Sequence, residues 1–119
     1  MLDLVQPLGG NYMKVCKFGG SSLSNGQNYR HAIDIIKSDP DRRVVVTSAP
    51  GKRYDGDIKV TDLLIKYANI VLAGKDSTDI VSQIFGRYQA IGSFFGVPEN
   101  DIEEIRKILL GLPKKEYPS

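Results

Sequence analysis

A lysine, two adjacent glycines and two serines stand together in the stretch Lys17–Ser22, which reads KFGGSS. Two adjacent glycines let a backbone come close to a ligand and reach dihedral angles closed to other residues. The first N–H groups of a following helix carry a partial positive charge. Lys17 adds a mobile full charge, and the serine hydroxyls can supply further hydrogen bonds. These residue types in this order are suited to binding a phosphate group.

The spacing of this stretch differs from the common nucleotide-binding motifs. A P-loop places its lysine after the glycines, as GxxxxGK[ST], whereas Lys17 precedes them. The run Gly51–Arg53 fails the same pattern because arginine stands where a hydroxyl is required, and the Rossmann spacing GxGxxG is also missing. Glycine and serine are common turn residues as well. Spacing alone therefore leaves open both a phosphate site and a tight strand-to-helix turn with a solvated lysine.

The elements around this stretch form a strand–helix–strand pattern. A short apolar segment predicts a strand over Met13–Phe18, the helical period of apolar residues predicts a helix over Gln27–Lys37, and RVVVTS predicts a strand over Arg43–Ser48. Three consecutive valines indicate a strand buried on both faces, as in a parallel sheet. Ligands of such sheets bind beyond the carboxyl ends of the strands. Lys17–Ser22 and Ser48–Lys52 are therefore expected at the same edge.

The rest of the chain divides into a loop, three helices and two ends. The polar loop Ala49–Lys59 could bring lysine and arginine to an anionic substrate, or its aspartates could balance them in solvent. Helical periodicity then begins at Val60, near Asp79 and around Glu99. Residues 1–12 are predicted to be an extension or linker, with an edge strand at 2–5 as the alternative, and 13–119 to be the domain. Residues 112–119 are predicted to be unstructured.

Composition limits the class of protein. The 119 residues suffice for one domain with a core but are few for an enzyme with two substrates. The net charge of +2, from 16 basic and 14 acidic residues, gives no reason to expect nucleic acid or a membrane surface as a partner. Cys16 is the only cysteine, so a disulfide within the chain and a cysteine metal cluster are both excluded. We expect a cytoplasmic protein, without a membrane span or signal peptide. The single histidine, His31, is expected to be a surface residue rather than a base.

Three motifs in order carry a family resemblance. KFGGSS on the first strand, VVVTSAPGKR on the second and KVTDLL at the next helix resemble the N-terminal part of the aspartate kinase catalytic domain, within the amino-acid kinase family. The resemblance extends from Met13 to the end of the chain. It implies an α/β fold, a partial three-layer αβα sandwich with a mainly parallel sheet.

The resemblance also implies a reaction, the ATP-dependent phosphorylation of the side-chain carboxylate of L-aspartate to 4-phospho-L-aspartate, toward lysine, threonine and methionine. ATP would bring its own Mg²⁺, and the chain is expected to supply no metal site. The positions that match the family's phosphate-binding and catalytic residues are Lys17, Gly19, Gly20 and Ser21, with Lys17 stabilising charge in the transition state. Ser48 and Thr61 match residues that hold aspartate.

The same resemblance shows what the chain lacks. Family members are several times longer and carry further substrate, nucleotide and regulatory segments beyond the point where this sequence stops. We therefore expect the chain alone not to turn over aspartate. Two other interpretations stay open: a family member that acts on glutamate, carbamate or a nucleotide, and a non-catalytic binding or assembly module. An incomplete domain exposes apolar surface that can bind a partner or form a homo-oligomer.

Overall fold

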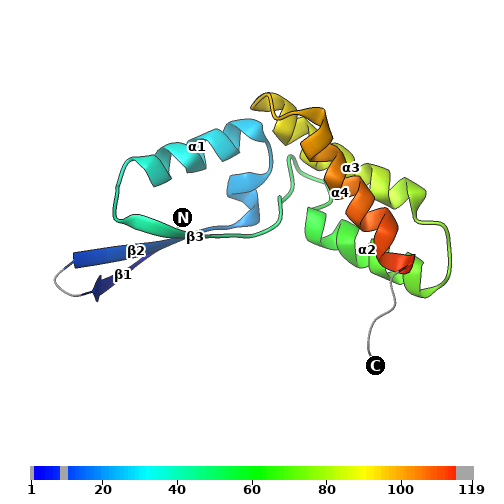
Figure 1. Ribbon diagram of the computed structural model, residues 1–119, viewed down its shortest axis with the longest axis horizontal. Coiled ribbons are helices and arrows are strands. Elements are labelled where there is room, and N and C mark those ends of the chain that lie inside the picture. Colours follow the sequence, from blue (N-terminus) through cyan, green and yellow to red (C-terminus); the bar gives the residue numbers. More distant parts are fainter. Residues whose placement is uncertain (1, 9–10, 115–119) are drawn as a thin grey trace. The chain divides into compact units, whose positions relative to one another are not determined.

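The computed structural model describes residues 2–8 and 11–114, which form two compact units. The first unit is Met1–Lys59 and the second is Val60–Ser119. The first unit contains strands β1 (Leu2–Leu8), β2 (Asn11–Phe18) and β3 (Arg42–Thr47) and helix α1 (Gly26–Lys37) (Figure 1). The second contains helices α2 (Val60–Leu72), α3 (Thr78–Phe94) and α4 (Glu99–Gly111). The candidate site predicted from KFGGSS lies in the first unit.

The first unit contains a three-stranded sheet of order β1-β2-β3. Strands β2 (Asn11–Phe18) and β3 (Arg42–Thr47) are parallel, and α1 (Gly26–Lys37) connects them. This arrangement confirms the predicted strand–helix–strand unit and the α/β class, with bounds within two residues of those expected.

The N-terminal segment corrects one expectation. We expected residues 1–12 to be an extension or linker, but β1 (Leu2–Leu8) pairs antiparallel with β2, from Leu2 opposite Lys17 to Leu8 opposite Asn11. This is the alternative of an edge strand, in a longer form. Backbone pairing accounts for it, because an antiparallel partner satisfies the free edge of β2 without needing a clear hydrophobic pattern. Residues 1, 9 and 10 lie outside the described residues, and the domain limit at 12/13 stays a prediction.

Helix α1 begins and ends where its side chains can replace missing backbone partners. Asn25 is the N-cap, and its Oδ1 accepts a hydrogen bond of 2.8 Å from the Asn28 N–H. Ser38 follows the last turn, and Pro40 stands two residues beyond it. The buried face of the helix packs over the end of β2, in a core formed by Cys16, Phe18, Leu23 and Ala32.

Strand β3 differs from the prediction of a strand buried on both faces. The side chains of Val44, Val45 and Val46 are 40%, 39% and 45% exposed. The reason is that these valines belong to neither buried core of the described residues, whereas Cys16 and Phe18 of the neighbouring β2 lie in the core under α1. A run of valines indicates that a strand is apolar enough to be buried, but the sequence of the strand does not show which other elements cover it.

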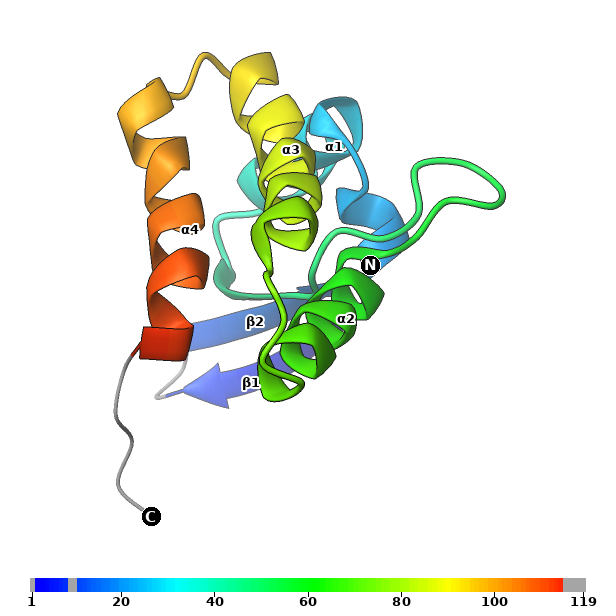
Figure 2. The ribbon, with the colours of Figure 1, turned by 90° about the vertical axis from the view of Figure 1, so that its right-hand side faces the viewer.

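The second unit is built from three helices, α2 (Val60–Leu72), α3 (Thr78–Phe94) and α4 (Glu99–Gly111). Figure 2 shows them side by side. The predicted starts are confirmed to within two residues. The buried core of this unit consists of Leu63, Tyr67, Ile80, Val81, Ile84 and Leu109. The Tyr67 hydroxyl donates a 2.5 Å hydrogen bond to the Leu109 carbonyl, which joins α2 to α4 inside this core.

The chain after α4 was expected to be unstructured, but Leu112–Lys114 forms a 3₁₀ turn. This turn continues the helical direction past Gly111, because proline is compatible with the first turn of a helical segment. Residues 115–119 lie outside the described residues. Among the helices of residues 2–8 and 11–114, none is both long and apolar enough to cross a bilayer.

Candidate functional site

Lys17 lies near the carboxyl end of β2 with its side chain exposed. Its neighbours Cys16 and Phe18 are 0% and 1% exposed and belong to the core under α1. Because side chains alternate along a strand, Lys17 points to the face of the sheet opposite α1. The strand thus anchors the lysine between two buried residues and leaves its amine free to meet an anion.

The glycines and serines form a turn of their own between β2 and α1. Gly20–Leu23 forms a short 3₁₀ turn, and α1 begins only at Gly26 behind its own cap. Gly19 has φ −77° and ψ 172°, which any residue can adopt, so its role is not an unusual dihedral angle. The start of α1 has a local cause, since Asn25 is a strong N-cap and fixes the first helical residue at Gly26, six residues beyond Gly20.

Gly20 packs directly against the loop that follows β3. The Gly51 N–H donates a 2.8 Å hydrogen bond to the Gly20 carbonyl. A Cβ on Gly51 would lie 2.6 Å from the Gly20 carbonyl carbon and 2.9 Å from the Ser21 nitrogen. The two loops therefore touch backbone to backbone, and only glycine leaves room for this.

A second hydrogen bond joins the same two loops at the strand ends. The Ser48 N–H donates to the Phe18 carbonyl at 3.1 Å, directly after β3. Together with the glycine contact, this confirms that Lys17–Ser22 and Ser48–Lys52 meet at one edge of the sheet. The edge is the carboxyl end of two parallel strands, where ligands of such sheets bind.

The turn is also fixed from the side of α1. The Asn28 side-chain amide donates to the Ser21 carbonyl at 3.1 Å and to the Ser24 hydroxyl at 2.9 Å. Ser24 is buried and donates to the same Ser21 carbonyl at 3.2 Å. These contacts hold the turn before any ligand arrives, so less order has to be imposed on binding. Sequence analysis missed Asn28, because a polar residue in a first helical turn gives no signal of this contact.

The loop after β3 balances one of its own charges. Arg53 donates from Nε to Asp57 Oδ2 at 2.7 Å and from its terminal nitrogen to Oδ1 at 3.0 Å. The Arg53 backbone N–H also donates to Oδ2 at 3.0 Å. The Arg53 hydrogen bonds hold the pKa of Asp57 well below its ordinary value, and Asp57 raises the pKa of Arg53. Arg53 is thus engaged in fixing the loop, whereas Lys52 is exposed beside Gly51.

The two residues expected to hold aspartate lie in different units. Ser48 follows β3 in the first unit, and its side chain is exposed. Thr61 is exposed in the first turn of α2, in the second unit. A joint action of Ser48 and Thr61 stays a prediction. Over residues 2–8 and 11–114, no three histidine, cysteine, aspartate or glutamate side chains gather in a way that could hold a metal ion.

Comparison with protein families identifies the family of the chain. Residues 13–109, which include the carboxyl ends of β2 and β3, match the model of the amino acid kinase family. The chain belongs to the amino acid kinase family.

Individual relatives are aspartokinases. The chain is 44% identical over 100 residues to aspartokinase 3 of Bacillus subtilis, covering 84% of this chain and 22% of that protein. It is 33% identical over 97 residues to a bifunctional aspartokinase/homoserine dehydrogenase of Buchnera aphidicola, covering 80% of this chain and 12% of that protein. The chain thus spans less than a quarter of the length of either relative.

A solved structure agrees with the sequence relatives. The aspartate kinase of Clostridium acetobutylicum, described as an allosteric enzyme, superposes with a TM-score of 0.78 at 33% identity. The match covers 87% of this chain and 24% of that chain. The likeness confirms the expected amino-acid kinase-like α/β fold and the resemblance to aspartate kinases.

Proposed function

We propose that this amino acid kinase family chain supplies the phosphate-binding and aspartate-binding part of an aspartate kinase. The reaction is transfer of the γ-phosphoryl group of ATP to the side-chain carboxylate of L-aspartate, which gives 4-phospho-L-aspartate for lysine, threonine and methionine biosynthesis. The observation that carries the proposal is the docking of Gly20 on Gly51 beside Lys17, at the carboxyl ends of two parallel strands.

The proposed role of Lys17 follows from the needs of phosphoryl transfer. Both ATP and aspartate are anions, and negative charge shifts among the transferred oxygens in the transition state. A fixed cation lowers the barrier if it interacts more strongly with that charge than with the separate reactants. Lys17 provides the charge, while Gly19, Gly20 and Ser21 form the wall along which the phosphates lie.

The proposed role of Ser48 and Thr61 is to hold the acceptor. Hydroxyl groups can donate to a carboxylate and accept from an ammonium group, which are the two charged ends of an amino acid. Aspartate then meets the phosphoryl group in a fixed orientation, and orientation supplies a large share of the rate in such transfers. Mg²⁺ would arrive with the nucleotide, where it neutralises phosphate charge.

An acceptor comparison in a longer protein tests this function. Residues 13–109 of this chain replace the corresponding segment of the Bacillus subtilis relative, because the printed chain spans 22% of that protein and is expected to be inactive alone. ADP release is measured with L-aspartate, L-glutamate and carbamate. We expect release only with aspartate. An active graft that prefers glutamate or carbamate would contradict the proposal that aspartate is the substrate. A graft that folds but releases no ADP would contradict the proposal of phosphoryl transfer from ATP.

One observation favours a second function, a binding or assembly module. The valines of β3 form an exposed apolar strand that lacks a second strand neighbour within the described part of the chain. An edge of this kind readily pairs with another strand, including that of a second copy. If the 119-residue chain associates in a concentration-dependent way and binds neither ATP nor aspartate, this function is favoured over the kinase.

A further inference from the structure

Two phenylalanines and a valine are exposed together at the turn that joins α3 to α4 (Figure 2). The side chains of Phe94, Phe95 and Val97 are 48%, 39% and 39% exposed. The two rings contact each other edge to face, with their centroids 5.1 Å apart. Single exposed apolar residues are common on protein surfaces, whereas a contiguous apolar cluster is a feature of interaction sites. These three residues are called the hairpin tip below.

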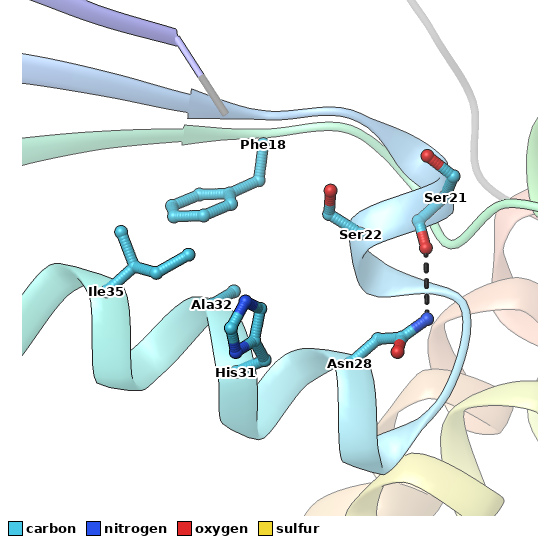
Figure 3. A pocket seen from close by; sticks show the side chains of 7 residues that line it. All are labelled: Phe18, Ser21, Ser22, Asn28, His31, Ala32 and Ile35. Carbon is cyan, nitrogen blue, oxygen red and sulfur yellow. Dashed lines mark hydrogen bonds between the residues drawn. The ribbon is translucent and has the colours of Figure 1, made fainter.

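The apolar groups of the hairpin tip are open to a partner, unlike those beside α1. Figure 3 shows the hollow beside α1, which Phe18 and Ala32 help to line. These two side chains are only 1% and 4% exposed, so the hollow presents almost no apolar surface to a ligand. At the hairpin tip a partner would remove a large apolar area from water, and this removal favours association.

Close packing of α3 on α4 keeps the rings of the hairpin tip outside the core of the second unit. A Cβ on Gly92 would lie 2.6 Å from Ile102 Cδ1, so the two helices touch directly beside the turn. Ile91 and Ile102 are buried there. Protein interiors are close-packed, so the helices leave no space between them for a phenyl ring. The exposure of the rings is therefore a consequence of the helix packing.

The turn holds the hairpin tip in one conformation. The N–H groups of Phe95 and Val97 both donate to the Gly92 carbonyl, at 3.1 and 2.9 Å. Gly96 has φ 69°, the left-handed conformation with which many helices end. A partner therefore meets an ordered surface, and little conformational entropy is lost there on binding.

The charges next to the hairpin tip are negative. Residues 88–105 contain four carboxylates and no lysine, arginine or histidine. Two of the carboxylates form ion pairs within α4. The other two, Glu99 and Asp101, are exposed in the first turn of α4, and Glu99 accepts a 3.2 Å hydrogen bond from the neutral side-chain amide of Gln89. The start of α4 offsets only part of their charge, because a helix N-terminus carries about half an elementary charge.

Rings and carboxylates together select a cationic partner. A lysine or arginine side chain is attracted by carboxylates and also by the face of an aromatic ring. The whole chain has a net charge of +2, so an attraction for cations has to be local to this surface. The same carboxylates repel an anionic lipid surface, which would otherwise accept exposed phenylalanines.

We propose that the hairpin tip, with Glu99 and Asp101, is a docking surface for a segment of another protein that carries lysine or arginine beside large apolar residues. The apolar residues of the partner pack on Phe94, Phe95 and Val97, and its cations lie against the two carboxylates. The inference depends on the second unit alone and does not need the proposed kinase activity.

Peptides of equal shape and opposite charge test the proposal on the 119-residue chain. A peptide of leucine and lysine, about 14 residues or four helical turns long, is titrated into the ¹⁵N-labelled protein at about pH 7. We expect saturable shifts of the amide signals of the hairpin tip, Glu99 and Asp101. The same peptide with glutamate in place of lysine should bind at least about tenfold more weakly, because like charges then meet. Vesicles that contain phosphatidylserine should leave these signals unchanged.

Substitution of the rings tests the apolar part of the surface. Phe94→Ala and Phe95→Ala should each weaken binding of the lysine peptide at least about fivefold, as expected for a central aromatic contact. Leu72→Ala is the matched control, because Leu72 is an 84% exposed apolar residue at the end of α2. It should leave the affinity unchanged. Spectra of the free variants that are unchanged away from the substituted position show that the fold is intact.

Substitution of the carboxylates tests the charge of the surface. Glu99→Gln combined with Asp101→Asn keeps the shape of both side chains and removes both charges. This double variant should weaken binding of the lysine peptide about three- to tenfold. Asp34→Asn, which removes an exposed carboxylate of α1, should leave the affinity unchanged.

Several results would overturn the proposal. The first is the absence of saturable shifts at the hairpin tip with the lysine peptide, and the second is equal or tighter binding of the glutamate peptide or of the vesicles there. The third is an affinity that neither ring variant lowers. Shifts of the hairpin tip that depend on protein concentration without any peptide would show that a second copy occupies it instead. Failure of the aspartate assay on the graft would leave this inference untouched, because the two tests use different residues and ligands.

Discussion

Gly51→Ala tests the contact between the two loops of the candidate site. The added Cβ would stand 2.6 Å from the Gly20 carbonyl carbon, 2.8 Å from its oxygen and 2.9 Å from the Ser21 nitrogen. All three are backbone atoms, so a rotamer change cannot relieve the overlap. Moving the loops apart also breaks the 2.8 Å hydrogen bond between Gly51 and Gly20. Overpacking costs about 1–3 kcal/mol and a lost hydrogen bond about 1 kcal/mol, so we expect a destabilisation of about 2–4 kcal/mol.

Gly19→Ala is the matched control for this substitution. No heavy atom lies within 4 Å of the Cβ position at Gly19, and its φ of −77° suits alanine. We expect a change within about 0.5 kcal/mol. Urea unfolding is followed by NMR signals of Cys16 and Phe18 for the first unit, with signals of Tyr67 as an internal reference in the second unit. Equal stability of the two variants would refute the argument that backbone contact fixes the turn.

Three further predictions concern other parts of the chain. Tyr67→Phe leaves the buried Leu109 carbonyl without its donor and should destabilise the second unit by about 1–2 kcal/mol, as measured by urea unfolding. Gly86→Ala should stabilise α3 by about 0.5–1 kcal/mol in the same assay, because nothing lies within 4 Å of its Cβ position and alanine favours a helix. Asp57 should titrate below the ordinary aspartate pKa of about 4, because Arg53 favours its charged form. Its contribution to the loop is therefore present above about pH 4 and is lost as the pH falls through the lowered pKa, which carboxyl-carbon NMR shifts would record; a midpoint at or above 4 would contradict the role of Arg53.

The fold was predictable where a local pattern decides it. Apolar periodicity placed α1 and the three helices of the second unit within two residues, because each helix buries one face in its own unit. The pattern could not show which neighbours a strand has. The run Val44–Val46 predicts a buried strand, but these valines are exposed. Leu2–Leu8 has no clear hydrophobic period, but it pairs with β2. Pairing depends on backbone groups that sequence does not distinguish.

The candidate site was predictable in its residue types but not in its contacts. Lysine beside two glycines at a strand end indicated an anion site, and the parallel strands predicted that the loops would meet. The sequence did not reveal that the backbone of Gly20 contacts the backbone of Gly51, because a glycine in a sequence does not show which other segment it contacts. Asn28 was missed for a similar reason, because its contact with Ser21 joins a helix to a preceding turn.

The most direct test of the central claim is the effect of Lys17→Ala on aspartate-dependent ADP release by the graft into the Bacillus subtilis relative. If Lys17 stabilises charge on the transferred phosphoryl group, kcat should fall at least about 100-fold. Lys37→Ala, which removes an exposed lysine at the end of α1, should leave the rate unchanged. A Lys17→Ala graft that keeps the fold and retains most of its kcat would contradict the account.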